Sequence, residues 1–144
     1  MEELYAELLL WYVGFHDENR YNNLLDEKFL NNPDNDLYLE LESYSFDLEK
    51  NMERFKLYWN YECGHLDPDL FGARLFAGLK VIYDANSFEI STFGNLCCRL
   101  WHLLPNYLIE VQPFHLLIYA DEPLSWGDEK QTREIFENGF SHYN

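Results

Sequence analysis

Four side chains of the metal-binding type occur in two close pairs along the chain. Cys63 and His65 are separated by one residue, while Cys98 and His102 are four residues apart and would share one face of a helix. If the two segments met, these four ligands could hold a zinc ion. However, the chain has no CxxC pair, and cysteine often serves as a small buried apolar residue. The pattern therefore favours packing, and we expect no metal or cofactor.

A cysteine nucleophile is the second chemistry that the residue types permit. Cys97 or Cys98 could pair with His102 or His115. Both cysteines lie in the most apolar stretch of the chain, whereas reactive thiols need an electropositive and partly exposed setting. Neither a GxGxxG nor a GxxxxGK[ST] loop for phosphate is present. We therefore assign no catalytic residue and predict that the protein is not an enzyme.

Carboxylates occur in close pairs that could perform acid–base or metal chemistry. The pairs are Glu40 and Glu42, Asp67 and Asp69, Asp121 and Glu122, and Asp128 and Glu129. A di-metal helical bundle needs Glu-x-x-His on facing helices, and only Glu62-Cys63-Gly64-His65 has these letters. Such pairs usually lie on solvated faces or cap helices, and we interpret them in that way.

The net charge limits the partners of the chain. The 144 residues include 26 acidic and 10 basic side chains, which gives a net charge of −16, yet 47% of the residues are hydrophobic and 18% are aromatic. This composition is too apolar for a disordered acidic tail and predicts a folded domain. Its field repels nucleic acid and membranes and attracts a basic partner. A nuclease with this charge would repel its own substrate.

Two further features indicate a compartment. The three cysteines are an odd number and two of them are adjacent, which does not suit a disulfide framework and favours a reducing environment. The apolar run from Leu8 to Val13 covers about a third of the ~20 residues that a membrane span needs. We therefore expect a cytoplasmic protein that contacts no membrane.

Two acidic segments with interleaved aromatic residues are candidate binding surfaces. The first spans residues 34–49 and contains Asp34, Asp36, Tyr38, Glu40, Glu42 and Tyr44, followed by Asp47 and Glu49. The second is a loop in which Trp126 is surrounded by Asp121, Glu122, Asp128 and Glu129. Aromatic side chains anchor interfaces, and carboxylates steer a basic partner toward them. The alternative for the second segment is that Trp126 packs as a lid on the core and Asp128 only caps a helix.

Helical periodicity dominates the elements that position these residues. Helices are predicted at residues 3–13, 18–30, 45–62, 67–83, 87–105 and 129–141. Ser45 would cap the third of these with Phe46 facing inward, and Asp128 with Gln131 has the capping-box pattern of the last. Residues 36–42 fit a helix or a strand, with helix preferred because helix formers dominate, and 114–119 stay ambiguous. The fold class is all-α, a single-domain bundle of about six helices over residues 1–144.

A small, acidic, single-domain chain with no catalytic motif resembles the immunity proteins of bacterial toxin systems. The resemblance is carried by size, charge and the two acidic aromatic segments. It implies that the protein binds and neutralises a basic toxin domain. Two alternatives are a nucleic-acid mimic that inhibits a DNA-binding enzyme and an enzyme with a Cys/His or carboxylate site. The charge is clustered rather than evenly spaced, which favours the immunity-protein interpretation. The sequence leaves the oligomeric state open.

Overall fold

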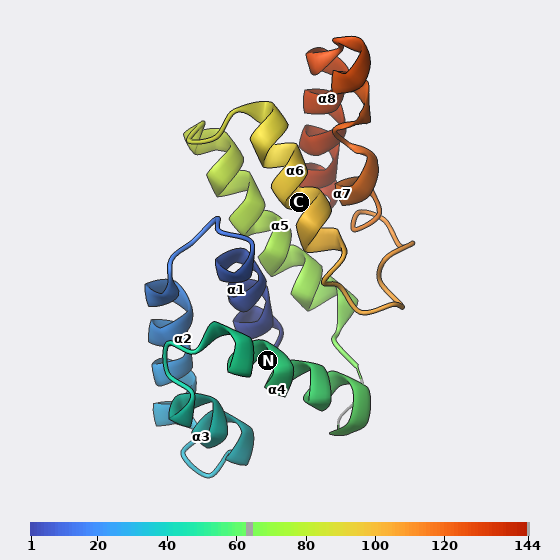
Figure 1. Cartoon of the computed structure of the whole chain (residues 1–144). Helices are drawn as coiled ribbons and strands as arrows, with labels where there is room; N and C mark the ends of the chain where they lie inside the picture. The colour runs from blue at the N-terminus through green and yellow to red at the C-terminus, as the bar shows by residue number, and fades with distance from the viewer. Residues whose placement is uncertain (63–64, 144) are drawn as a thin grey trace. The chain divides into compact units, whose positions relative to one another are not determined.

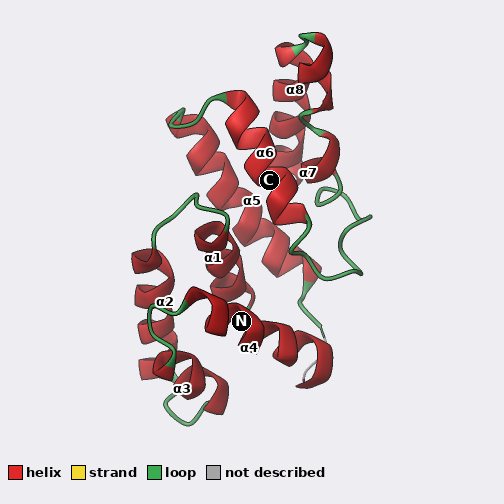
Figure 2. Cartoon of the chain, viewed as in Figure 1, coloured by secondary structure: helices red, strands yellow, loops and turns green. Residues whose placement is uncertain are grey.

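The computed structural model describes residues 1–62 and 65–143, and within these ranges every regular element is a helix (Figures 1 and 2). The predicted all-α fold class is confirmed. The helices form two compact units, Met1–Asp67 and Pro68–Asn144. The single domain over residues 1–144 stays a prediction.

Unit 1 is built around its first helix. Its elements are α1 (Glu2–Tyr12), α2 (Glu18–Asn31), α3 (Asp36–Ser43), α4 (Leu48–Leu57) and the π-helix η1 (Tyr58–Glu62). Helix α1 packs against α2 and α4, and α2 packs against α3. The Tyr5 ring lies 5.3 Å from the ring of Phe55 and 5.7 Å from that of Trp59, so α1 and α4 share an aromatic core.

Side-chain caps explain where the helices of unit 1 begin. The carboxylate of Asp17 accepts from the backbone N–H of Asn19, and the Asn35 side chain accepts from that of Tyr38. Each bond satisfies a donor that the first turn of a helix leaves open. Residues 36–42 are therefore helical, as preferred, because Asn35 caps them and α3 packs on α2.

The predicted helix over residues 45–62 is wrong at its start and in its last turns. Asp47, and not Ser45, caps α4 by accepting from the N–H of Lys50, and the helix continues into η1. Phe46 lies before the cap, and its side chain is exposed rather than inward. Ser45 and Asp47 are both good capping residues, and in the packed structure of unit 1 it is Asp47 that caps the helix.

Unit 2 contains the remaining elements. They are α5 (Pro68–Ala85), α6 (Ile90–Trp101), α7 (Leu116–Tyr119), the 3₁₀ helix η2 (Glu122–Trp126), α8 (Glu129–Phe140) and the 3₁₀ helix η3 (Ser141–Tyr143). Helix α8 contacts α5, α7 and η2, and α6 contacts α7. The Phe93 ring lies 5.0 Å from Phe136 and 5.6 Å from Tyr83, which joins α6, α8 and α5 in one aromatic cluster.

The structure refines three expectations for unit 2. Helix α6 starts at Ile90 rather than near residue 87, and it ends at Trp101, before Pro105. The ambiguous stretch 114–119 ends in the short helix α7 and is not a strand. Asp128 accepts from the N–H of Gln131 at 3.0 Å, so the predicted cap of the last helix is confirmed.

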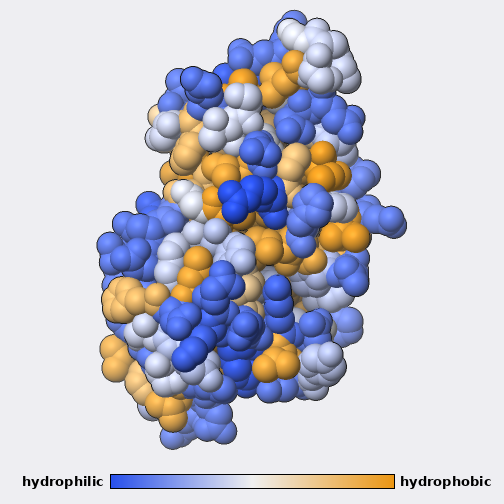
Figure 3. All heavy atoms as spheres, viewed as in Figure 1, coloured by the Kyte–Doolittle hydropathy of each residue, from blue (hydrophilic) through white to orange (hydrophobic). Residues whose placement is uncertain are grey.

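The surface of each unit is mixed in polarity. Figure 3 shows hydrophilic residues over much of the visible face, with separate hydrophobic patches between them. Within residues 1–62 and 65–143, no helix combines the length and the apolar content that crossing a bilayer requires.

Candidate functional site

The cysteine and histidine side chains of unit 2 do not form an activated pair. Burial raises the pKa of Cys97 well above its ordinary value, and burial together with Asp121 raises that of Cys98 to about 12. The Cys98 thiol donates to the Asp121 carboxylate at 3.5 Å, and His102 Nδ1 lies 2.8 Å from the backbone oxygen of Cys98. Both thiols are therefore protonated at neutral pH, and the imidazole is bonded to the backbone rather than to sulfur.

The metal-type residues of the sequence are not assembled in the described part of the chain. Cys63, the first member of the four-residue zinc pattern and the second letter of Glu-x-x-His, lies outside the described residues. Residues 1–62 and 65–143 contain no group of three or more His, Cys, Asp or Glu that could hold an ion.

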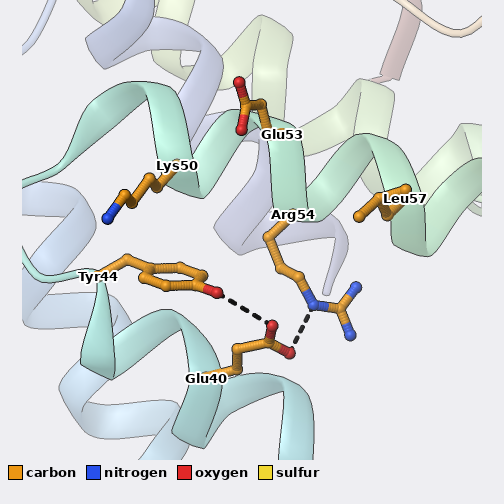
Figure 4. A pocket seen from close by; sticks show the side chains of 6 residues that line it. All are labelled: Glu40, Tyr44, Lys50, Glu53, Arg54 and Leu57. Carbon is orange, nitrogen blue, oxygen red and sulfur yellow. Dashed lines mark hydrogen bonds and ion pairs between the residues drawn. The ribbon is translucent and has the colours of Figure 1, made fainter.

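A polar cleft of about 250 Å³ lies between α3 and α4 in unit 1 (Figure 4). It is lined by Glu40, Tyr44, Lys50, Glu53, Arg54 and Leu57. At its centre, Nε of Arg54 donates to Oε2 of Glu40 at 2.6 Å, and the Tyr44 hydroxyl donates to Oε1 at 3.1 Å. A second Arg54 nitrogen donates to Glu62 at 2.9 Å. Arg54 therefore joins α3, α4 and η1.

These hydrogen bonds occupy both carboxylate oxygens of Glu40 within unit 1. The hydrogen bond from Arg54 lowers the pKa of Glu40, while the bond to Glu40 raises the pKa of the Tyr44 phenol. The Arg54 side chain is only 12% exposed, so it replaces lost hydration with the two carboxylates. The sequence predicts that Glu40 and Tyr44 contact a partner, but in the structure both are hydrogen-bonded within unit 1.

Glu42 has a different environment on α3. Its Oε1 atom is buried without a hydrogen-bond partner. Burial, followed by a hydrogen bond and repulsion from Asp26 on α2, raises the pKa of Glu42 from 4.5 to about 7. A neighbouring carboxylate and a low-dielectric setting both disfavour the ionised form of a carboxyl group. Glu42 is therefore a half-buried acid with one buried oxygen, and its pKa of about 7 distinguishes it from an ordinary surface carboxylate.

The turn between α3 and α4, residues 44–47, contains a non-glycine residue with a positive φ, and we call it the Phe46 turn. Phe46 has a φ of 65°, in the left-handed region, and its side chain is 64% exposed. Asn51 lies beneath the turn with no solvent exposure. Its amide donates to the carbonyl oxygens of Tyr44 at 2.9 Å and Asp47 at 2.8 Å, and its oxygen accepts from the Tyr21 hydroxyl at 2.6 Å. One buried amide thus holds both sides of the turn.

The other predicted residues of the first segment divide into buried and exposed groups. Tyr38 is only 6% exposed and belongs to the core of unit 1, so its predicted role as a surface anchor does not fit this fold. Asp34, Asp36 and Glu49 are exposed and form no hydrogen bond or ion pair through their side chains with the described residues. These three carboxylates are available to a partner.

The second predicted segment places Trp126 at the end of η2. Its side chain is 63% exposed, so it is not a lid on the core. Asp128 caps α8, Asp121 accepts from the Cys98 thiol, and Glu129 lies 3.4 Å from Arg133 in an exposed pair. An exposed pair of that kind contributes little energy, so Glu129 can exchange its partner. Glu122 and Glu129 are exposed and lie four residues before and three residues after Trp126 in the sequence.

Phe46 is the surface residue that sequence reasoning missed. A signal was present, because Asp47 is a strong capping residue three positions before Lys50. A helix that starts after Asp47 leaves Phe46 outside its apolar stripe.

Comparison of the chain with protein-family models, with curated proteins and with solved structures gave no match.

Proposed function

We propose that the protein binds a basic protein and blocks its action, and that this partner is a bacterial toxin domain for which the chain is the immunity protein. The proposal is carried by Trp126, a large aromatic side chain that is 63% exposed and has Glu122 and Glu129 nearby in sequence. Tryptophan is enriched among the residues that dominate binding energy. A rigid indole beside carboxylates suits a partner that presents an apolar recess within a cationic surface.

The charge of the chain supports this mechanism kinetically. A net charge of −16 steers a basic partner into encounter and raises the association rate. A buried aromatic contact then slows dissociation. The combination gives tight, stoichiometric inhibition without any chemical step. The high pKa values of Cys97 and Cys98 agree with a role in which no thiol acts as a nucleophile.

The test begins with affinity capture on the tagged chain, identification of the captured protein by mass spectrometry, and purification of that protein. We expect a basic partner whose toxicity on expression is suppressed when the chain is co-expressed. The association rate constant should fall by more than about tenfold between ~50 and ~500 mM salt, because screening removes the steering.

Two variants locate the contact. Trp126→Ala should weaken binding by about 30-fold or more, the loss expected when an interface anchor is truncated. Val81→Ala is the matched control, because Val81 is an exposed apolar residue of the same unit with no described polar partner. An acidic partner, a salt-independent association rate or equal affinity of the two variants would each refute the proposal. Displacement of the partner by DNA at comparable charge would instead support nucleic-acid mimicry.

A further inference from the structure

We propose that the Phe46 turn of unit 1 is a second protein-binding anchor, which places the Phe46 ring against an amphipathic segment rich in lysine and arginine. The inference rests on the proposed function only in taking the partner to be basic. The Phe46 turn belongs to unit 1, whereas Trp126, which carries the proposed function, belongs to unit 2.

The backbone conformation of Phe46 is unfavourable for its residue type. A φ of 65° costs a bulky L-residue conformational energy that glycine avoids, and asparagine tolerates it better than phenylalanine. The second non-glycine residue with positive φ in the described chain is Asn86, which follows this preference. Strained positions of this kind concentrate at functional sites. Phe46 is therefore at a position where folding alone would favour another residue.

Packing within unit 1 does not account for the phenylalanine. Its side chain is 64% exposed, and its ring makes no aromatic contact with the described residues. An exposed benzyl group contributes little to the core, because the hydrophobic gain scales with the area removed from water. The side chain thus gains little from packing that would offset the strained backbone, and a partner that buries the ring would add to this gain.

The clamp beneath the turn fixes the backbone on both sides of Phe46. Asn51 is fully buried and donates to the carbonyl oxygens of Tyr44 and Asp47, the residues that bound the turn. The N–H of Asp47 also donates to the oxygen of Tyr44 at 2.9 Å. A preorganised anchor loses little conformational freedom on binding, which favours affinity.

The charge around the turn selects the occupant. Residues 34–49 include six acidic and no basic side chains, and three of the acids, Asp34, Asp36 and Glu49, are exposed without a described partner. Glu49 and Glu53, two and six residues after the turn, are exposed and have no hydrogen bond or ion pair among the described residues. The Lys50 ammonium lies 5.7 Å from the centre of the Tyr44 ring. An exposed apolar ring with free carboxylates close in sequence is complementary to an amphipathic segment that combines lysine or arginine with leucine-type side chains.

The probe for this surface is a helical peptide of leucine and lysine, about 18 residues long so that it forms five turns. A peptide of leucine and glutamate with the same pattern is its charge-reversed control. Binding to the full chain is measured by fluorescence anisotropy, and backbone amide shifts in NMR spectra locate it. We expect the leucine–lysine peptide to bind and to shift the amides of residues 45–49 most strongly.

Phe46→Gly separates the binding role from the folding role. Since glycine relieves the left-handed backbone, the variant should unfold at the same temperature as the native chain or a few degrees higher, by about 2–4 °C. It should nevertheless bind the leucine–lysine peptide at least about tenfold more weakly. Leu39→Ala is the matched control, because Leu39 is an exposed apolar side chain in the same acidic segment, and it should change affinity by less than about threefold.

Each outcome decides between the alternatives. Equal binding of Phe46→Gly and the native chain, equal binding of the two peptides, or shifts outside the turn would overturn the proposal. Concentration-dependent dimerisation that Phe46→Gly abolishes would assign the turn to a second copy of the chain and also overturn it. Trp126→Ala should leave peptide binding at the Phe46 turn unchanged, so a failure of this inference and a failure of the proposed function give different patterns.

Discussion

Replacing Glu42 with glutamine should stabilise the protein at neutral pH and remove part of its pH dependence. The carboxyl of Glu42 has a buried oxygen without a partner, and burial and Asp26 raise its pKa from 4.5 to about 7. The charged form is therefore less favourable in the folded state than in the unfolded chain. The proton-bound form carries no such penalty, and glutamine mimics it at every pH.

The size of the effect follows from the two pKa values. The difference between 4.5 and about 7 corresponds to a penalty of about 3 kcal/mol on the ionised form, at 1.36 kcal/mol for each tenfold change in the ionisation constant. Glu42 is partly exposed, so solvent screening reduces the expected effect to about 1–2 kcal/mol. Between about pH 4.5 and 7 the folded state holds more protons than the unfolded state, so this contribution to stability falls as pH rises.

The assay is urea unfolding followed by circular dichroism at about pH 5 and pH 8, with the native chain, Glu42→Gln and Glu49→Gln. Glu49→Gln is the control for net charge, because Glu49 is an exposed carboxylate without a described partner and its loss also reduces self-repulsion. We expect Glu42→Gln to exceed the native chain by about 1–2 kcal/mol at pH 8 and by much less at pH 5. An equal gain from both variants at pH 8, or a gain from Glu42→Gln that does not change with pH, would refute the reasoning.

Three further perturbations test other parts of the structure. Asn51→Leu should lower the free energy of unfolding by about 2–4 kcal/mol in urea titrations, because it removes a buried amide that makes three hydrogen bonds; a loss under ~1 kcal/mol would contradict the clamp. Gly94→Ala should destabilise by about 1–2 kcal/mol despite the better helix propensity of alanine, since the new Cβ would lie 2.6 Å from Cβ of Asp121; a more stable variant would contradict that packing. Cys98 and Cys97 should react with iodoacetamide at about pH 8 at least tenfold more slowly in the folded than in the urea-unfolded chain, measured by peptide mass spectrometry, because their pKa values are raised.

Local sequence signals predicted the helices well where a cap and an apolar stripe agreed. Asp128 with Gln131 marked the start of α8, and the Asp67-Pro68-Asp69 run marked that of α5. The all-α class followed from such agreement along the chain. Residues 36–42, where both periodicities fitted, proved to be the capped helix α3.

The turn between α3 and α4 could not be predicted from local signals. Ser45 and Asp47 are both good capping residues, and choosing between them requires Asn51 to be placed beneath the turn. That placement depends in turn on Tyr21, which is 30 residues away in sequence. Whether the Phe46 side chain points inward or to solvent therefore depends on tertiary packing. The helical pattern alone predicted that it faces the core.

Burial was the second quantity that the pattern could not assign. Tyr38 and Tyr44 alternate with carboxylates in the same way, yet Tyr38 is buried against the core and Tyr44 donates to Glu40 at the cleft. Trp126 has a similar acidic setting and is exposed. The acidic and aromatic content therefore identified two candidate segments, but it could not predict which aromatic side chain in each segment is exposed.

The net charge of −16 overstates the anionic surface that a partner can use. Asp17, Asp47 and Asp128 are occupied as helix caps, Glu40 is held by Arg54, and the pKa of Glu42 is raised to about 7 by burial and by Asp26. Carboxylates in such roles are already stabilised by donors and would lose those donors on pairing with another cation. The proposed recognition would therefore use exposed carboxylates that are unpaired or, like Glu129, only weakly paired. A matching partner would need a few well-placed cations around an apolar recess rather than a uniformly basic face.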